Sequence, residues 1–233
     1  MDETLHNENR RSFLKRASLF AVAVHAGVFI NCASPARTQP AGVEPLAKTA
    51  RRVGGDCEGC EAIHDGLPSQ LNWETRIAGA AEPGELLEAS GVIYRPDGKT
   101  PAPGVILYAY HTDAQGIYAP APGATGFARR HGRLRGWSRT NAKGEYKFIT
   151  IKPASYPGSV IPSHIHLIVK EADKNEYYID DFEFEGDRFL TVQERARRRQ
   201  AGGSGIVRLN RGAGGVAVAR RDIILGLNVQ NYS

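Results

Sequence analysis

Two histidines separated by a single residue, His164 and His166, give the strongest local indication of chemistry in this sequence. Side chains alternate between the two faces of a β-strand, so both imidazoles of such a pair project to the same side. Two imidazoles in that arrangement can chelate zinc, copper or iron. The alternative is a hydrogen-bonded or solvent-exposed pair with no ligand, and the motif alone does not decide between the two.

Two tyrosines upstream favour the metal-binding interpretation. Tyr156 precedes Pro157, which disfavours helical backbone at the residue before it. Tyr118 follows Gly116 just after a predicted strand, and neither tyrosine lies in a pattern that would explain it as core packing. A phenolate oxygen is a hard anionic donor that favours Fe(III) over Fe(II), zinc or copper. A trivalent cation can drive the loss of a phenol proton whose usual pKa is about 10.

Short strands downstream of about residue 86 must position these side chains. Runs rich in Val, Ile, Tyr and Phe recur there, separated by Gly, Pro, Asp and Asn. Many short strands with polar turns predict an all-β fold, either a sandwich or a barrel. One short helix is expected, because Thr191 and Glu194 have the spacing of a capping box. The arginine-rich run that follows, residues 195–199, is more typical of a solvated face than of an anion site.

The first residues predict export. The segment 9–15 resembles a twin-arginine signal, and the apolar stretch 17–30 is too short to span a membrane. We therefore expect residues 1–32 to be a signal segment and the protein to be periplasmic or associated with the cell envelope; an ordinary basic amphipathic helix is the alternative. This export route carries folded proteins, often with a cofactor already bound. Membrane attachment is expected only if Cys32, directly after the apolar stretch, is lipidated.

Residues 33–85 have little periodicity and much Pro, Gly and Ala, which predicts a linker and an N-terminal arm. Cys57 and Cys60 form a C-x-x-C pair within this arm. In an oxidising compartment the pair could close a small disulfide loop. Together with His64 it could instead belong to a zinc site, although no fourth ligand is evident.

Composition indicates a soluble globular protein. Hydrophobic residues make up 41% of the chain and charged residues 24%, which argues against a disordered or multi-span membrane protein. The net charge of +5 could steer small anions, but it is weak evidence for nucleic acid, which we do not expect as a partner. The sequence contains no internal repeat, phosphate-binding loop, dinucleotide fingerprint or nucleophile elbow.

Taken in order, several segments resemble the intradiol ring-cleavage dioxygenases, the family of catechol and protocatechuate 3,4-dioxygenases. The resemblance covers about residues 86–225, and the ordered combination is more specific than any single motif. It implies that residues 86–233 form a catalytic domain with a two-sheet β-sandwich core, long loops and one short helix. The segments that carry it are the strand ending in Gly116-Ile117-Tyr118, the hairpin 140–153 before Tyr156, Pro162-Ser163-His164-Ile165-His166 and Phe184-Glu185-Gly186-Asp187.

The resemblance also implies one mononuclear, non-haem Fe(III) ion held by Tyr118, Tyr156, His164 and His166. The implied reaction inserts O2 into a small aromatic diol and opens the ring between the two hydroxylated carbons, giving a muconate-type diacid. Tyr156 matches the tyrosine that leaves the metal when the diol binds and that accepts one of the diol's protons. Known relatives form dimers or larger assemblies, so a homo-oligomer is expected by analogy.

One position departs from the pattern of the family. Family members usually have an arginine three residues before the first histidine of the pair, where it helps to stabilise charge on the substrate, and this chain has Ile161 there. A basic residue from segment 131–139 could substitute, and we take Arg133 as the candidate catalytic residue. The other candidates are Arg135 and Arg139, and the alternative is that all three are solvated. Trp137 in the same segment could line the pocket or lie in the core.

Two functions therefore stay open from the sequence. The first is an exported iron dioxygenase that acts on a catechol, a hydroxyquinol or a larger aromatic diol. The second is an exported binding module that kept the sandwich, and the metal or the aromatic ligand, but lost turnover. A zinc-bound structural protein is a third, weaker interpretation. Fold alone does not separate them.

Overall fold

The computed structural model describes residues 51–232, and every structural statement below concerns that part of the chain. The predicted signal segment 1–32, Cys32 and the first part of the predicted linker lie outside the described residues. The strands are β1 (Glu74–Arg76), β2 (Leu86–Tyr94), β3 (Ile106–Tyr110), β4 (Arg135–Arg139), β5 (Glu145–Ile151), β6 (His164–Lys170), β7 (Tyr177–Tyr178), β8 (Phe182–Phe184), β9 (Ile206–Val207), β10 (Leu209–Arg211), β11 (Ala217–Arg220) and β12 (Ile223–Ile224). The helices are η1 (Cys60–Ile63), α1 (Gly126–Arg130), α2 (Val192–Ala196) and η2 (Ala213–Gly215), of which η1 and η2 are 3-10 turns.

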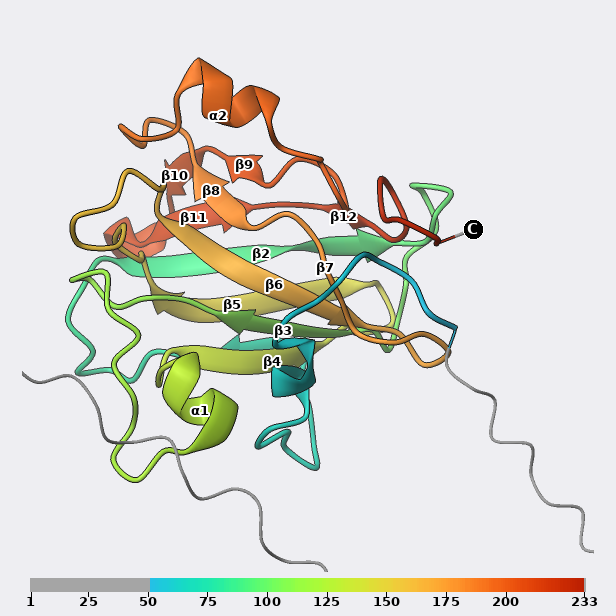
Figure 1. Ribbon diagram of the computed structural model, residues 1–233, viewed down its shortest axis with the longest axis horizontal. Coiled ribbons are helices and arrows are strands. Elements are labelled where there is room, and N and C mark those ends of the chain that lie inside the picture. Colours follow the sequence, from blue (N-terminus) through green and yellow to red (C-terminus); the bar gives the residue numbers. More distant parts are fainter. Residues whose placement is uncertain (1–50, 233) are drawn as a thin grey trace, which may run out of the picture. The chain divides into compact units, whose positions relative to one another are not determined.

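The strands form two mixed sheets, each of six strands (Figure 1). The first sheet has the order β1-β5-β2-β11-β10, and β12 also pairs with β2. The second sheet has the order β4-β3-β6-β8-β9, and β7 also pairs with β6. This arrangement confirms the predicted all-β, two-sheet fold.

The core between the sheets follows from strict alternation along the strands. In β2, every second residue is buried, including Leu87, Ala89 and Ile93. The side chains of Leu107 in β3 and Leu167 in β6 belong to the same apolar cluster. Complete burial of one such aliphatic side chain contributes about 1.5–3 kcal/mol, so a cluster of this size stabilises the pairing of the two sheets.

The second sheet is covered on its other face as well. Tyr108 and Tyr110 of β3, Trp137 of β4 and Ile168 of β6 form a separate buried cluster with Ile63 of η1. The positions that alternate with the core in β6 therefore face the N-terminal arm. His164 and His166 lie on this face, outside the core of the sandwich.

The described part of the predicted linker, from residue 51 onward, packs against the sheets. Its strand β1 pairs in parallel with β5 of the first sheet. Cys57 and Cys60 are disulfide-bonded, which agrees with the disulfide interpretation and not with the zinc site. His64 instead donates a hydrogen bond to Glu176, at 2.7 Å. The arm is therefore fixed to the domain and covers the face that carries the two histidines.

The predicted helix begins where the capping box placed it. The Thr191 hydroxyl accepts a hydrogen bond from the Glu194 backbone N–H at 3.2 Å, and α2 follows directly. A second short helix, α1, was not predicted. It has only five residues, and its N-cap, Thr125, makes no capping hydrogen bond through its side chain, so the sequence carried no signal for it. None of the helices in residues 51–232 has the length and apolar character needed to cross a membrane.

Candidate metal centre

Strand β6 presents His164 and His166 from the same face. The register of the sheet sets His166 opposite Tyr110 of β3, and the two rings stack with centroids 4.5 Å apart. The rings of His164 and His166 are nearly perpendicular, at 77°, and their Nε2 atoms lie 3.1 Å apart. The two-residue period of the strand thus produces the chelating arrangement that the sequence predicted.

The loop that carries Tyr118 is shaped by Asp113. The Asp113 carboxylate accepts hydrogen bonds from the backbone N–H groups of Gln115 and Ile117, at 2.9 and 3.0 Å. Its backbone carbonyl accepts from the N–H of Ala154, at 3.1 Å, in the loop that leads to Tyr156. One buried acidic residue therefore ties both tyrosine loops together.

Glycine is required where these two loops touch. Gly116 has φ +82°, and a Cβ atom placed there would lie 2.1 Å from the carbonyl oxygen of Ser155. That separation is far shorter than any van der Waals contact, and a positive φ disfavours other residues. The close approach brings Tyr118 and Tyr156 to the same point.

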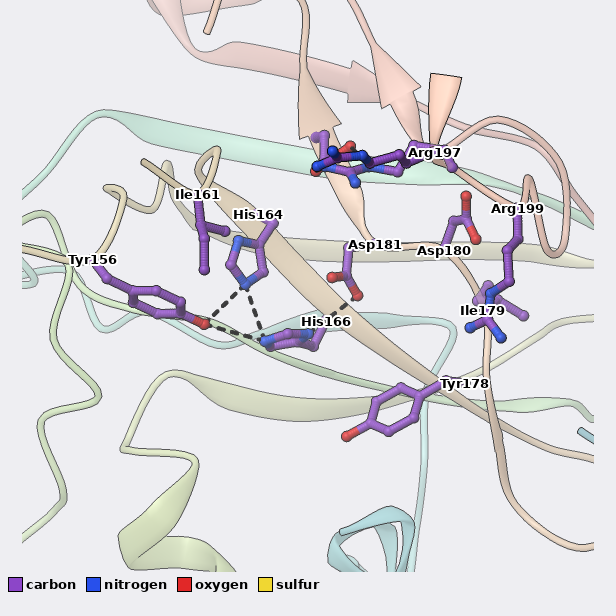
Figure 2. A pocket seen from close by; sticks show the side chains of 12 residues that line it. Tyr156, Ile161, His164, His166, Tyr178, Ile179, Asp180, Asp181, Arg197 and Arg199 are labelled. Atoms are coloured by element: carbon purple, nitrogen blue, oxygen red, sulfur yellow. Dashed lines mark hydrogen bonds and ion pairs between the residues drawn. The ribbon is translucent and has the colours of Figure 1, made fainter. Parts of the chain in front are cut away.

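The four predicted ligand residues converge (Figure 2 shows Tyr156, His164 and His166). Tyr118 Oη lies 2.9 Å from Tyr156 Oη, which lies 3.0 Å from His164 Nε2 and 3.5 Å from His166 Nε2. A metal that binds nitrogen and oxygen at about 2.0–2.1 Å sets its neighbouring ligands about 2.8–3.4 Å apart. The spacing of this donor set therefore fits a single ion.

The outer nitrogens of both imidazoles are already engaged. His164 Nδ1 donates to the carbonyl of Pro162 at 2.7 Å, and His166 Nδ1 donates to the carboxylate of Asp181 at 3.2 Å. Both Nε2 atoms are consequently lone-pair acceptors that face each other. Burial lowers the pKa of His164, which disfavours a shared proton between the rings. A cation bound between the two Nε2 atoms would accept both of these lone pairs.

The phenols are neutral unless a cation binds them. Burial raises the pKa of Tyr118 and of Tyr156 above the ordinary value of about 10. Their mutual hydrogen bond raises the pKa of Tyr118 further and lowers that of Tyr156, as expected if Tyr118 donates to Tyr156. Ionisation of these oxygens near neutral pH therefore requires a strongly charged metal ion.

Asp181 was missed by the sequence reasoning. Its carboxylate forms a group with His164 and His166 in which the potential ligand atoms all lie within 4.8 Å of one another. However, Asp181 contacts Nδ1 of His166, whereas Tyr156 contacts its Nε2. It is therefore placed to orient His166 from behind, as carboxylates commonly do for metal-bound imidazoles. Asp181 lies between two short strands, where no motif marks it.

A cavity of about 570 Å³ opens beside this cluster. Tyr156, His164 and His166 line it, whereas Tyr118 does not. Tyr156 is thus the phenol that meets an incoming molecule, and Tyr118 lies behind it. Ile161, which is 47% exposed, contributes an apolar wall. The other lining residues are Tyr178, Ile179, Asp180, Asp181, Glu183, Arg197, Arg198 and Arg199.

The structure gives Arg133 a different partner from the one predicted. Arg133 Nε donates to Glu82 at 3.0 Å in a bidentate ion pair, and Arg133 is not among the residues that line the cavity. Arg135 donates to the carbonyl of Asp65 at 2.9 Å, and its guanidinium lies 5.2 Å from the ring centroid of Trp137. Arg139 is also absent from the cavity lining. The geometry therefore offers no support for any of these arginines facing a metal.

The structure decides between the two places that the sequence left open for Trp137, and it gives the arginine run a role beyond the one predicted. Trp137 is buried, and its indole N–H donates to the carbonyl of Ile63 at 2.6 Å, so it belongs to the packed cluster and not to the cavity wall. The predicted solvated face at residues 195–199 is confirmed for Arg195, Arg197 and Arg199, which are exposed, but Arg197, Arg198 and Arg199 also line the cavity. Arg198, just after α2, donates to Glu183 of β8, and this contact holds the run beside the site.

Comparisons with known proteins identify a matching family model and similar proteins. Residues 63–202 match the family model described as "Dioxygenase". Catechol 1,2-dioxygenase 1 of Acinetobacter lwoffii is 28% identical over 159 residues, which are 56% of this chain and 50% of that protein. The chain therefore spans about half the length of this curated relative.

Two solved structures show the shared fold. Catechol 1,2-dioxygenase from Pseudomonas arvilla C-1 is 21% identical, with a TM-score of 0.51 over 67% of this chain and 58% of that one. The mercury-inhibited catechol 1,2-dioxygenase from Acinetobacter sp. ADP1 is 20% identical, with a TM-score of 0.50 over the same shares of the two chains. Similarity at this level concerns the arrangement of the strands.

Proposed function

This chain belongs to the intradiol dioxygenase family, and from that premise we propose that it is a non-haem Fe(III) enzyme that cleaves the ring of a catechol-type diol. The proposed reaction consumes one O2 and breaks the bond between the two hydroxylated carbons. The product is a muconate-type diacid. The family uses non-haem iron, which fits a donor set of two phenols and two imidazoles.

One observation carries the proposal. Tyr156 Oη lies 2.9–3.5 Å from Tyr118 Oη and from both Nε2 atoms, and the two Nε2 atoms lie 3.1 Å apart, at the edge of a cavity that admits a ligand. We assign Tyr118, Tyr156, His164 and His166 as the iron ligands on this basis. Zinc and copper suit imidazole equally well, but the paired phenols favour Fe(III).

The protein's own residues have distinct tasks in this scheme. A bound ferric ion would supply the Lewis acidity and redox capacity that let a diol react with O2. Tyr118 stays in place, because it is packed behind the cavity beside Tyr110, with ring centroids 6.0 Å apart. Tyr156 faces the cavity, so its oxygen is positioned to accept a proton from a diol hydroxyl. Asp181 holds the ring of His166 in place throughout.

The proposal is tested with the purified, iron-loaded full chain. A ferric-phenolate centre gives a visible charge-transfer band, and catechol should shift that band and then be consumed with an equal amount of O2. Loss of the band in Tyr118→Phe and its weakening in Tyr156→Phe would link it to these residues. A colourless preparation that binds iron only weakly would refute the proposal.

A second function is favoured by one specific residue. Ile161 occupies the place where the family usually has an arginine, and no arginine of segment 131–139 lines the described cavity. A binding module without turnover would show the spectral shift on addition of catechol but no O2 consumption. The same oxygen-electrode experiment therefore separates the two functions.

We also propose export by the twin-arginine route to the periplasm or cell envelope. The signal-like segment 9–15 supports this, and so does the Cys57–Cys60 disulfide, because such bonds persist in oxidising compartments. Fractionation of cells that express the wild type and Arg10→Lys/Arg11→Lys tests the route. Retention of the variant in the cytoplasm is expected, and equal export of both would contradict it.

A further inference from the structure

We propose that Arg197 and Arg199 bind an anionic group on the substrate, carried on a side arm at a distance from the two ring hydroxyls. The substrate would then be an elongated aromatic diol with a carboxylate at its far end. This inference rests on the proposed function, since it concerns what the same cavity binds.

Arg198 fixes the arginine run relative to the metal ligands. Its Nε and Nη2 donate to the Glu183 carboxylate at 2.7 and 2.6 Å, in the bidentate arrangement that gives strong charge-assisted bonds. Glu183 is the register partner of His164 in the β6–β8 pair. Arg198 is thus an anchor, and its two neighbours are carried to the cavity beside Asp180 and Asp181 (Figure 2).

The acidic groups of the cavity are already engaged. Glu183 is occupied by Arg198, and Asp181 accepts from His166. Asp180 accepts from the backbone N–H groups of Gln200 and Ala201, at 2.8 and 3.1 Å. Among residues 51–232, none of these three carboxylates forms an ion pair with Arg197 or Arg199.

The remaining arginines are accessible and weakly paired. Arg197 contacts Glu194 at 2.7 Å, but its side chain is 72% exposed, and Glu194 also accepts from Arg198. Exposed pairs of this spacing are worth only about 0.3–0.5 kcal/mol, so a ligand carboxylate can displace Glu194. Arg199 is exposed and forms no ion pair with any other residue between 51 and 232. Each guanidinium group is exposed and lines the cavity, so each is accessible to a planar carboxylate.

The available space indicates an elongated ligand. The cavity of about 570 Å³ lies in the usual range for drug-sized molecules, and a bare catechol ring would leave much of it to water. Tyr178 and Arg199 also line a second cavity of about 320 Å³, which is bounded by residues 54–57 and 228–230. Tyr178 and Arg199 therefore stand at the boundary between the two cavities, at the end of the first cavity that is shared with the second. Ile161 provides an apolar contact for the ring at the metal end.

The first test compares substrates in the iron-loaded full chain. The ratio of kcat/KM for 3,4-dihydroxycinnamate to that for catechol is measured in the wild type and in Arg197→Gln/Arg199→Gln. Loss of charge-assisted hydrogen bonds should lower this ratio about 10–100-fold. The matched control, Arg195→Gln/Arg208→Gln, removes two exposed arginines that do not line the cavity, and its ratio should equal that of the wild type. Equal ratios in all three proteins would overturn the inference.

A second test requires neither iron nor turnover. Calorimetry measures binding of 3,4-dimethoxycinnamate and of its methyl ester, which lacks the charge, to the metal-free protein. The acid should bind at least about tenfold more tightly than the ester in the wild type, and this preference should vanish in the double variant. If the acid is preferred but no diol is turned over, the proposed dioxygenase function fails and the inference stands.

The converse outcomes overturn the inference. If diols are turned over but acid and ester bind equally, the enzyme assignment stands and the arginine assignment fails. If inorganic phosphate competes as well as the aromatic acid while the ester does not bind, the arginines form a general anion site. That result would also overturn the assignment to a substrate side arm.

Discussion

Replacement of Asp181 by asparagine tests how the metal centre is built. Asparagine keeps the size of the side chain and a carbonyl oxygen that can accept from His166 Nδ1, but it removes the charge. A hydrogen bond to a charged acceptor is worth about 1.5–3 kcal/mol, against about 0.5–1.5 kcal/mol for a neutral one. We therefore expect the imidazole to become a weaker ligand while the fold is retained.

The geometry of the Asp181–His166 contact sets the expected size of the loss in iron affinity. The Asp181–His166 distance of 3.2 Å is longer than the about 2.7–2.9 Å typical of charge-assisted bonds, and the side chains are 29% and 22% exposed. Changes behind a metal-bound histidine usually lower metal affinity 10–100-fold. The long, partly solvated contact favours the lower end, about tenfold or about 1.4 kcal/mol.

The assay is competition for iron between the protein and a chelator, followed through the visible phenolate band. Asp180→Asn is the matched control, because it removes the same charge from the neighbouring residue, whose carboxylate accepts from backbone N–H groups and not from an imidazole. Its iron affinity should change less than about threefold, since charge in a solvated cavity is well screened.

A different pattern would refute this reasoning. If Asp181→Asn abolished iron binding while Tyr118→Phe and Tyr156→Phe kept it, the carboxylate would be a direct ligand. The centre would then be the two-histidine, one-carboxylate type that serves Fe(II) oxygenases, and the phenols would be bystanders.

Three further predictions concern the supports of the site. Gly116→Ala should push the Ser155 backbone away and lower iron affinity at least about tenfold, as measured by the same competition. Arg221→Met should lower the free energy of unfolding by about 3–5 kcal/mol in urea titration, because the buried guanidinium donates to the carbonyls of Asp180, Ala201 and Gly203. Burial lowers the pKa of His111 to about 4. Between pH about 6.5 and 4, the unfolded chain therefore binds one more proton at His111 than the folded protein does. Stability of the metal-free protein should therefore fall as the pH falls through that window, and less steeply in His111→Gln.

Each of these predictions has a matched comparison. Gly158 has a similar positive φ, of +72°, but a Cβ atom there would meet nothing within 4 Å. Equal loss of iron affinity in Gly116→Ala and Gly158→Ala would therefore contradict the steric argument. Arg220→Met removes an exposed arginine next to the buried one and should change stability by less than about 0.5 kcal/mol. For His111, parallel pH profiles in the wild type and the variant would show that other groups control the acid transition.

The sequence by itself determined which residues share a face. A His-x-His pair in a strand projects to one side because side chains alternate with a period of two residues. Short runs of strand-forming residues separated by polar turns predicted an all-β fold, and the capping-box spacing of Thr191 and Glu194 predicted the start of α2. These features depend on neighbours within a few positions along the chain, which is why they can be inferred without coordinates.

Tertiary structure alone decided which distant groups meet. Arg133 and Arg197 are both basic residues in polar segments, but Arg133 pairs with Glu82, 51 positions away, while Arg197 turns back to the cavity. Asp181 lies in the chain between the short strands β7 and β8. Both strands pair with β6, and this pairing places Asp181 behind His166. The partner of a charged side chain depends on sheet register and loop path, and these depend on the packing of the whole chain, which local periodicity does not encode.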